Sequence, residues 1–392
     1  MNNSKISINL ATRKNDGWPT EEQNLLLKAA LLQGPEVVEY WNKWRSTVEF
    51  EDIDNSSQCL LPLLYENLSE HGIDEPILSK YKGVYRMIWY KNQMVVQHIS
   101  PILEELQTVG VKIMVLNGAA LIEGYNQHQR LRRIGTVDLL VPVDRGPDCV
   151  DILFDRGWQP EDGRSRKSFT ECHYTWQNAH SFINHAGHKL NLVWHLALDS
   201  VYGNSDEDFW RCGRLTEFTG LTFRALCQID QLLAVCVNAA WGKSEPVIQW
   251  IADAAMIMQN SPSQIDWERM LRVSSKHRLV LPLREILIYL VKLLDLAIPQ
   301  EIIQRLESME VSKTELWEHQ IRKRSNGWTG NLPRYWFNYA RLSRKEKAST
   351  LQFNFTGFPK YLQTLWTLDH LWQVPVHAGY KGMRRVWKRV LG

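Results

Sequence analysis

The sequence predicts an α+β protein in which a small mixed-sheet core is inserted between N-terminal helices and a helical C-terminal half. Three observations indicate this fold class. Apolar residues recur at helical spacing before residue 110 and again after residue 224. Short apolar and β-branched runs, each stopped by a turn, occupy the interval between them. After residue 310 the composition becomes basic and aromatic, which sets a C-terminal extension apart from the rest.

The first 110 residues carry the start signals of several helices. Thr20 and Gln23 have the spacing of a capping box, in which each side chain bonds to the backbone of the other. Pro35 opens the segment PEVVEYWNKW, because proline suits the first turn of a helix. CLLPLLYENLSEHG is a third helical segment, and residues 92–109 form a longer one that ends at Gly110.

Residues 111–200 change to strand-like patterns. The runs KIMVL (112–116) and TVDLLVPV, which Pro142 stops, are strand candidates, and the helix-like DCVDILFDRGW follows them. HSFINHA and HKLNLVWHLAL are typical of a strand pair joined by a tight turn at residues 186–187. We therefore expect five segments: a flexible N-terminus (1–19), a helical segment (20–110), an α/β core (111–222), a helical domain (223–310) and a basic, aromatic-rich extension (311–392).

The charge of the chain is unevenly distributed. The formal net charge is +3, yet residues 311–392 hold 15 Lys or Arg and only 4 Asp or Glu. This asymmetry predicts an anionic partner at the C-terminus, such as nucleic acid, anionic lipid, a phosphosugar or a nucleotide. The final segment, GYKGMRRVWKRVLG, can form a basic amphipathic helix with Met383, Val386, Trp387 and Val390 on one stripe.

Other features concern the compartment. We find no apolar run of the roughly 18 to 20 residues that a membrane-spanning helix needs, and no signal-peptide core at the N-terminus. The six cysteines contain no C-x-x-C pair, which favours reduced thiols over a zinc site or a disulfide framework. These features predict a cytoplasmic protein without a transmembrane segment.

Asp138 is the most informative residue of the predicted core. It lies in a strand that is otherwise apolar, and a carboxylate there needs a partner, because burying an unpaired charge is costly. Magnesium, which prefers oxygen ligands, is one candidate partner. Arg132 or Arg133 in the preceding loop is the other, and the residues alone leave both open. Since strand side chains alternate, Thr136 shares the face of Asp138.

The order of these elements resembles the uncharacterised bacterial nucleotidyltransferase family within the polymerase-β-like superfamily. In that family a K-G-x-x-L turn opens a helix, an R-x-x-x-D-I-D-L-L-V strand follows, and a later strand carries an acid before a His-Trp pair. The matching segments here read LNGAAL (116–121), RRIGTVDLLV (132–141) and LNLVWH (190–195). The resemblance covers most of residues 20–300, including the helical stretches on both sides of the core.

The resemblance implies transfer of a nucleoside monophosphate from an NTP to a sugar, peptide, small-molecule or protein acceptor. It further implies two Mg²⁺ ions held by three carboxylates. It assigns catalytic positions to Asp138, Thr136 and Asn191, with Asp138 as the metal ligand. It assigns nucleotide binding to the turn and to the arginine loop, at Asn117, Gly118, Ala119, Arg132 and Arg133.

The departures from the family pattern concern the same positions. Thr136 replaces the first strand acid, Asn191 the third acid, and Asn117 the turn lysine. Only Asp138 remains of the three carboxylates, so the resemblance predicts weak Mg²⁺ binding at a partly degenerate site. Glu123 and Asp199 are nearby acids that could compensate. The alternative is a catalytically inactive fold that serves as a binding or assembly module in a biosynthetic pathway.

Overall fold

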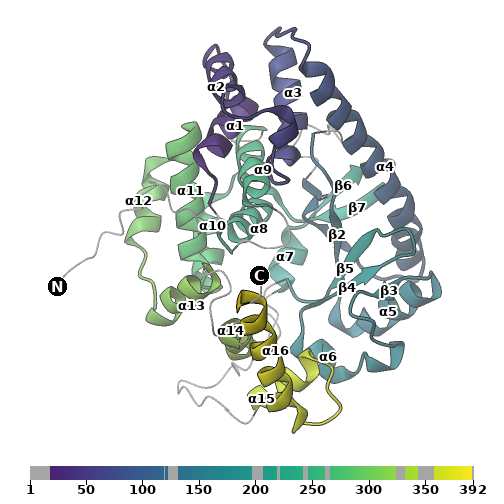
Figure 1. The fold of residues 1–392 in the computed structure, drawn as a ribbon. Coiled ribbons are helices and arrows are strands. Elements are labelled where there is room, and N and C mark those ends of the chain that lie inside the picture. The colour runs from purple at the N-terminus through teal and green to yellow at the C-terminus, as the bar shows by residue number, and fades with distance from the viewer. Residues whose placement is uncertain are drawn as a thin grey trace, which may run out of the picture. The chain divides into compact units, whose positions relative to one another are not determined.

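The structure is a computed structural model that describes residues 18–118, 120–121, 131–196, 206–218, 221–241, 246–260, 265–323, 332–342 and 357–390. It contains helices and a seven-stranded mixed sheet (Figure 1), and the predicted α+β class is confirmed. The chain divides into two compact units. The first comprises Met1–Asn92, Leu121–Arg133 and Gln228–Ser325, and the second comprises Gln93–Ala120, Ile134–Cys227 and Asn326–Gly392. Each unit combines parts of several sequence segments, and the five-segment domain division remains a prediction.

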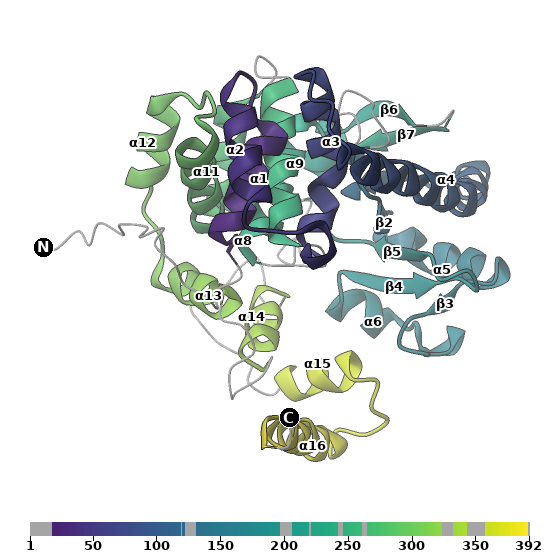
Figure 2. The same ribbon diagram turned by 45° about the horizontal axis from the view of Figure 1, so that its top comes forward.

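The first unit is helical. Helices α1, α2, α8, α9 and α11 pack on one another, and Figures 1 and 2 show α1, α8, α9 and α11 side by side. The predicted capping box is present at the start of α1, because the Thr20 side chain accepts from Gln23 N and Gln23 reciprocates. The helices and 3₁₀ turns of this unit are α1 (Glu21–Leu31), α2 (Glu36–Arg45), η1 (Phe50–Asp52), η2 (Ser57–Leu60), α3 (Leu61–Glu70), α8 (Gln228–Trp241), α9 (Val247–Asn260), α10 (Trp267–Lys276), α11 (Val280–Leu294), α12 (Gln300–Ser308) and α13 (Lys313–Lys323).

The long helix α4 (Leu78–Thr108) begins in the first unit and ends in the second. It starts 14 residues before the helix that the sequence predicts at residues 92–109. The physical reason is that residues 78–91 already place apolar residues on one face, of which Leu78, Tyr81 and Ile88 are buried.

The second unit is built on the sheet, with strand order β3-β4-β5-β2-β1-β7-β6. The central strands β2 and β5 are parallel, while β1–β2 and β4–β5 are antiparallel. The elements are β1 (Met114–Leu116), β2 (Thr136–Leu140), η4 (Val143–Arg145), α5 (Gly146–Asp155), β3 (Gln159–Pro160), η5 (Arg166–Ser168), α6 (Glu171–Trp176), β4 (Ala179–Ile183), β5 (Lys189–Val193), α7 (Glu207–Cys212), β6 (Arg214–Phe218), β7 (Leu221–Ala225), α14 (Leu332–Leu342), α15 (Gly357–Leu365) and α16 (Gln373–Val390).

The β4–β5 hairpin confirms the strand pair that the sequence predicts. Its turn is closed by Asn184, whose Oδ1 accepts from Ala186 N and His188 N, and Gly187 adopts a φ of +81° that favours glycine. The sequence did not reveal the β6–β7 hairpin, whose strands are five residues each. Strand β7 extends the sheet by pairing in parallel with β1.

Alternation divides the sheet into two faces. His180 and Phe182 of β4 point to one face, where Phe182 contacts Phe154 of α5 and His180 contacts His173 of α6. Ser181, Asn191 and Asp138 therefore share the opposite face, which α5 and α6 do not cover.

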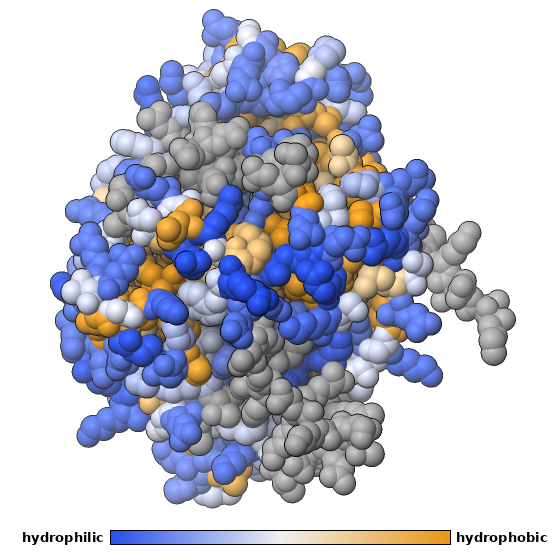
Figure 3. Space-filling model, turned by 180° about the vertical axis from the view of Figure 1, so that it is seen from behind, coloured by the Kyte–Doolittle hydropathy of each residue, from blue (hydrophilic) through white to orange (hydrophobic). Residues whose placement is uncertain are grey.

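The surface in Figure 3 is mostly hydrophilic, with hydrophobic residues in separate patches between, as is usual for folded proteins.

Arg132 and Asp253 form a buried ion pair within the first unit. Arg132 is fully buried and donates from Nε to Asp253 Oδ1 (2.8 Å) and from Nη2 to Asp253 Oδ2 (2.9 Å). Its guanidinium also donates to the Arg133 carbonyl and lies over the Trp250 ring. Bidentate pairing of this kind offsets part of the cost of desolvating both charges.

We expect Asp253→Ala to lower the free energy of unfolding by about 3–5 kcal/mol, because it leaves the Arg132 charge buried without its partner. Chemical denaturation of the intact chain measures this. Removing both charges in Arg132→Met/Asp253→Leu should cost less than Asp253→Ala alone. As a control, Lys43→Ala breaks an exposed pair with Glu39 and should leave stability nearly unchanged. A single variant that is no less stable than the double variant would contradict this account.

Candidate functional site

A row of polar side chains crosses the open face of the sheet in the second unit. Register pairs Asp138 of β2 with Asn191 of β5 on one side and with Leu116 of β1 on the other. Asn191 in turn pairs with Ser181 of β4. Because directly paired residues point to the same face, Ser181, Asn191 and Asp138 form a line, and Asn117 follows directly after Leu116 at the end of β1. All four side chains are half-buried. We call this set the Asp138 row.

Both oxygens of the Asp138 carboxylate accept hydrogen bonds from amides. Asn117 Nδ2 donates to Oδ2 at 2.6 Å, and Asn191 Nδ2 donates to Oδ1 at 2.6 Å. Such bonds to a charged acceptor are shorter and stronger than bonds between neutral groups. Two neutral amides therefore surround the one carboxylate of the row.

The orientation of Asn191 is fixed by Asp138. An amide flipped about its axis would place two acceptors, Asn191 Oδ1 and the carboxylate, against each other, so the amide nitrogen faces Asp138. The amide oxygen then faces Ser181, whose Oγ donates to Asn191 Oδ1 at 2.6 Å. The Ser181 hydroxyl can donate or accept, and it completes this arrangement by donating.

The orientation of Asn117 comes from the backbone. Asn117 has a φ of +47°, in the left-handed region that asparagine tolerates better than most residues. The turn is closed by the Ala120 N–H, which donates to the Asn117 carbonyl at 2.7 Å. Gly118, with a φ of +21°, is buried in this turn. The strand therefore stops at Leu116, and the next side chain reaches across to Asp138.

The predicted site residues fall into three groups. Asp138, Asn191 and Asn117 are brought together, and Thr136 is half-buried on the same face two residues before Asp138. Arg132 and Arg133 belong to the first unit, where Arg132 pairs with Asp253 and Arg133 is exposed. The third group, Ala119, Glu123 and Asp199, lies outside the described residues.

A pocket of about 310 Å³ lies at the edge of β4, where β3 ends. It is lined by Glu161, Asp162, Gln177, Ala179, His180 and Ser181. Ser181 thus belongs both to the pocket and to the Asp138 row. One buried nitrogen here, Gln177 Nε2, makes no hydrogen bond, which leaves it available to a polar ligand, whereas His180 Nε2 lies 3.3 Å from Asp162 Oδ1. Sequence reasoning missed this pocket, because its residues come from two segments, 161–162 and 177–181, which the pairing of β3 with β4 brings together.

The histidines near the pocket are neutral. Burial, together with the nearby charges of His180 and Arg164, lowers the pKa of His173 to about 3. Burial also lowers the pKa of His180 to about 4, although Asp162 opposes the shift. For Asp162, burial raises the pKa, but the hydrogen bond from Arg164 and the charge of His180 outweigh it and leave the pKa below its usual value.

Three further histidines of this region lie away from His173 and His180. His185 and His188 contact His98 of α4, and His195 Nδ1 lies 3.4 Å from Asp206 Oδ2. The histidines of residues 173–195 therefore form three separate groups in the second unit.

The neutral histidines predict a loss of stability in acid. Unfolding returns the pKa of His173 and His180 to about 6.5. Below that pH these two histidines bind protons in the unfolded chain but stay neutral in the folded chain. We expect the free energy of unfolding to fall as pH drops from 6.5 towards 4.5, by on the order of 1–3 kcal/mol per histidine. Denaturation at a series of pH values measures this fall.

His180→Gln should flatten this pH dependence, whereas the same substitution at the exposed His185 should leave it in place. The range stops at about pH 4.5 so that protonation of Asp162, whose pKa lies below its usual value, does not contribute. Parallel curves for the wild-type chain and His180→Gln would show that His180 is not the titrating group.

The geometry agrees with what a comparison of the sequence with protein families finds. The model of a family described as uncharacterised nucleotidyltransferase matches residues 56–295, which include the whole Asp138 row and the pocket. No curated protein matches the chain. Since the family model covers more than half of the sequence, this chain belongs to the uncharacterised nucleotidyltransferase family.

Proposed function

We propose that this protein binds an NTP at the Asp138 row and transfers its nucleoside monophosphate to a sugar, peptide, small-molecule or protein acceptor. The observation that carries the proposal is the convergence of the Asn117–Gly118 turn with Asp138 and Asn191 in one hydrogen-bonded row. Membership of the nucleotidyltransferase family supports the same chemistry.

The phosphates would bind where the turn leaves β1. The left-handed backbone at Asn117 and Gly118 lets a phosphate approach the main chain closely. The two predicted arginines belong to the first unit, where Arg132 is paired with Asp253 and Arg133 is exposed, so the proposed phosphate site rests on the turn alone. Asn117 could turn from Asp138 towards a phosphate oxygen, since its amide donates to either.

The donor set does not fit a pair of metal ions held by the protein alone. Asp138 supplies one negative charge, and the Asn191 amide oxygen already accepts from Ser181. One Mg²⁺ that arrives with the triphosphate is a better fit, because magnesium is commonly held by one or two carboxylates together with substrate phosphates. Such an ion would neutralise phosphate charge while the nucleotide is bound.

The acceptor would use the pocket at the edge of β4. The pocket is joined to Asp138 through Ser181 and Asn191, so the two sites share one hydrogen-bonded chain. His180 points to the opposite face of β4 from Ser181 and has no role at the row, whereas Gln177 Nε2, which makes no hydrogen bond, can donate to an acceptor in the pocket. A polar acceptor without strong negative charge suits a pocket whose carboxylates are Glu161 and Asp162.

The first test of this function is isothermal titration of ATP, CTP, GTP and UTP, each with Mg²⁺ or Mn²⁺ and with EDTA. We expect at least one nucleotide to bind more tightly with the metal than without it. Asp138→Ala should remove the metal dependence, because it removes the one charge of the row, while Asp144→Ala, at an aspartate outside the row, should not. No binding of any nucleotide would refute the proposal.

Adding carboxylates at the two neutral positions Thr136 and Asn191 tests whether their missing charge weakens metal binding. Thr136→Asp/Asn191→Asp places three carboxylates on one face, and each added charge is worth several kcal/mol at an effective dielectric near 20, as an upper limit. We expect the double variant to bind Mn²⁺ at least about tenfold more tightly, and Mn²⁺ to raise its Tm. The control Thr222→Asp adds a charge at an exposed strand position. An equal response of both variants would contradict the assignment.

A second candidate function is a binding or assembly module without catalysis. The observation that favours it is that both Asp138 oxygens already accept amide N–H groups, as they would in a purely structural network. This candidate predicts that Asp138→Ala leaves nucleotide binding and biological activity unchanged in a chain that folds normally.

A further inference from the structure

Helix α16 presents an exposed apolar stripe. Trp372, which precedes the helix by one residue, and Val376, Tyr380 and Met383 are 66%, 63%, 56% and 63% exposed. Their spacing of four, four and three residues places them on one face of a helix. Single exposed apolar residues are common on folded proteins, but four of them in line along one helix are not.

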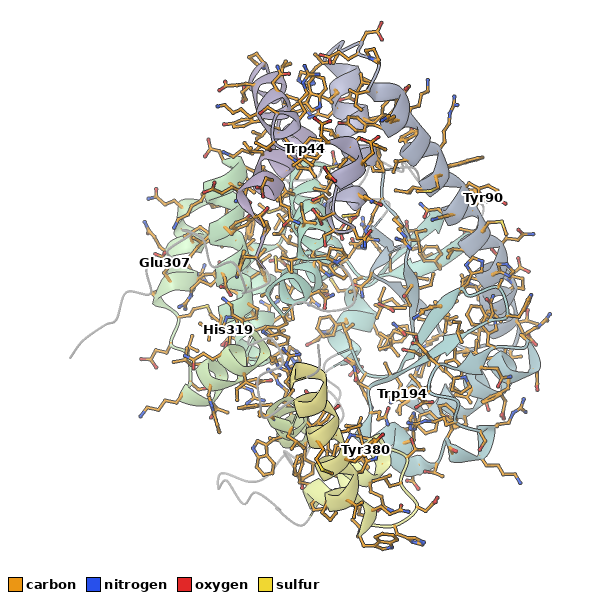
Figure 4. The ribbon with its side chains drawn as sticks, in the orientation of Figure 1. Trp44, Tyr90, Trp194, Glu307, His319 and Tyr380 are labelled. Atoms are coloured by element: carbon orange, nitrogen blue, oxygen red, sulfur yellow. The ribbon has the colours of Figure 1, made fainter. Side chains whose placement is uncertain are left out.

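The opposite face of α16 is packed, which fixes the direction of the stripe. Val374 is buried in a cluster with Tyr339, Tyr361 and Leu362 of α14 and α15. Further along, the His377 ring lies 5.0 Å from the Trp366 ring, and Lys381 Nζ lies over that same ring. Figures 1 and 2 show α15 and α16 side by side, and Figure 4 labels Tyr380 on α16.

The charge of this segment has a single sign. The sequence from residue 370 to the C-terminus contains no Asp or Glu, and it contains Lys381, Arg384, Arg385, Lys388 and Arg389. An apolar helix face combined with many Lys and Arg and no acid is the pattern of helices that lie in the interface of an anionic membrane. The apolar face would match the acyl chains of such a membrane, and the Lys and Arg residues would match its anionic headgroups.

We propose that α16 binds the surface of a membrane containing anionic lipid, with the stripe Trp372, Val376, Tyr380 and Met383 inserted among the headgroups. Two other partners explain only half of the observations. Nucleic acid would engage the basic residues but leave the stripe exposed. A second copy of α16 would cover the stripe but would bring like charges together. Among the described residues no helix is long and apolar enough to cross a membrane, and this proposal requires none.

The test is flotation of the full chain with vesicles of phosphatidylcholine alone or with about 30% phosphatidylglycerol, a composition that gives a negative surface potential. We expect binding to the anionic vesicles only, weakened by salt. Val376→Asp/Tyr380→Asp should lower the bound fraction at least about tenfold, because it places two charges in the inserted stripe. The matched control is Tyr90→Asp on α4, at a tyrosine that is 60% exposed, which should bind as the wild-type chain does.

Four outcomes would overturn the proposal. One is a wild-type chain that does not float with anionic vesicles. A second is a wild-type chain whose salt-dependent affinity for nucleic acid exceeds its affinity for anionic vesicles. A third is a Val376→Asp/Tyr380→Asp variant that keeps its vesicle binding. The last is a wild-type dimer in solution that this variant dissociates while vesicle binding is absent. Near-ultraviolet circular dichroism of each variant confirms that the chain is folded.

Discussion

The candidate site depends on one carboxylate held between two amides. Asp138 lies in the central strand β2, and its neighbours Asn117 and Asn191 each give it an N–H at 2.6 Å. A carboxylate on a half-buried sheet face must be neutralised, paired or hydrogen-bonded, and here hydrogen bonds from neutral groups perform that role. Ser181 extends the network by donating to Asn191 Oδ1. The row is therefore hydrogen-bonded from β1 to β4 before any ligand binds.

The resemblance implies that family members carry acids where this chain has Thr136 and Asn191. Neutral side chains at both positions avoid repulsion between acids on adjacent strands, so the free protein does not require cations to hold the sheet face together. They also supply less attraction for metal ions. Stability of the unliganded row and affinity for metal are thus opposed, and the proposed NTP, which would bring its own ion, would reconcile them.

Much of the site could be predicted from the sequence because it depends on strand alternation. Parity alone places Thr136 with Asp138, and the resemblance to the family adds Asn117 and Asn191. The hydrogen bonds of the two amides to Asp138 could not be predicted, since one of them depends on the left-handed backbone at Asn117. Arg132 illustrates a different limit. Its partner Asp253 lies 121 residues away on α9, a distance at which residue spacing gives no information.

The fold, like the site, could be predicted from the sequence only in part. Long periodic helices and the β4–β5 hairpin were predicted from local patterns. The β6–β7 hairpin was missed although its strands have the same length, five residues each. The pocket at the edge of β4 combines residues of the β3 end, the segment after α6 and β4 itself, so only the folded chain brings His180, Gln177 and Ser181 together.

The most direct test of the central claim is anomalous diffraction from crystals soaked with Mn²⁺, with and without a non-hydrolysable NTP analogue. If the Asp138 row is a hydrogen-bonded network that accepts only an ion brought by the nucleotide, one Mn²⁺ peak appears beside Asp138 with the analogue and none without it. Two Mn²⁺ peaks at the row in the absence of nucleotide would contradict the account, because they would show that the amides and one carboxylate suffice to hold a metal pair.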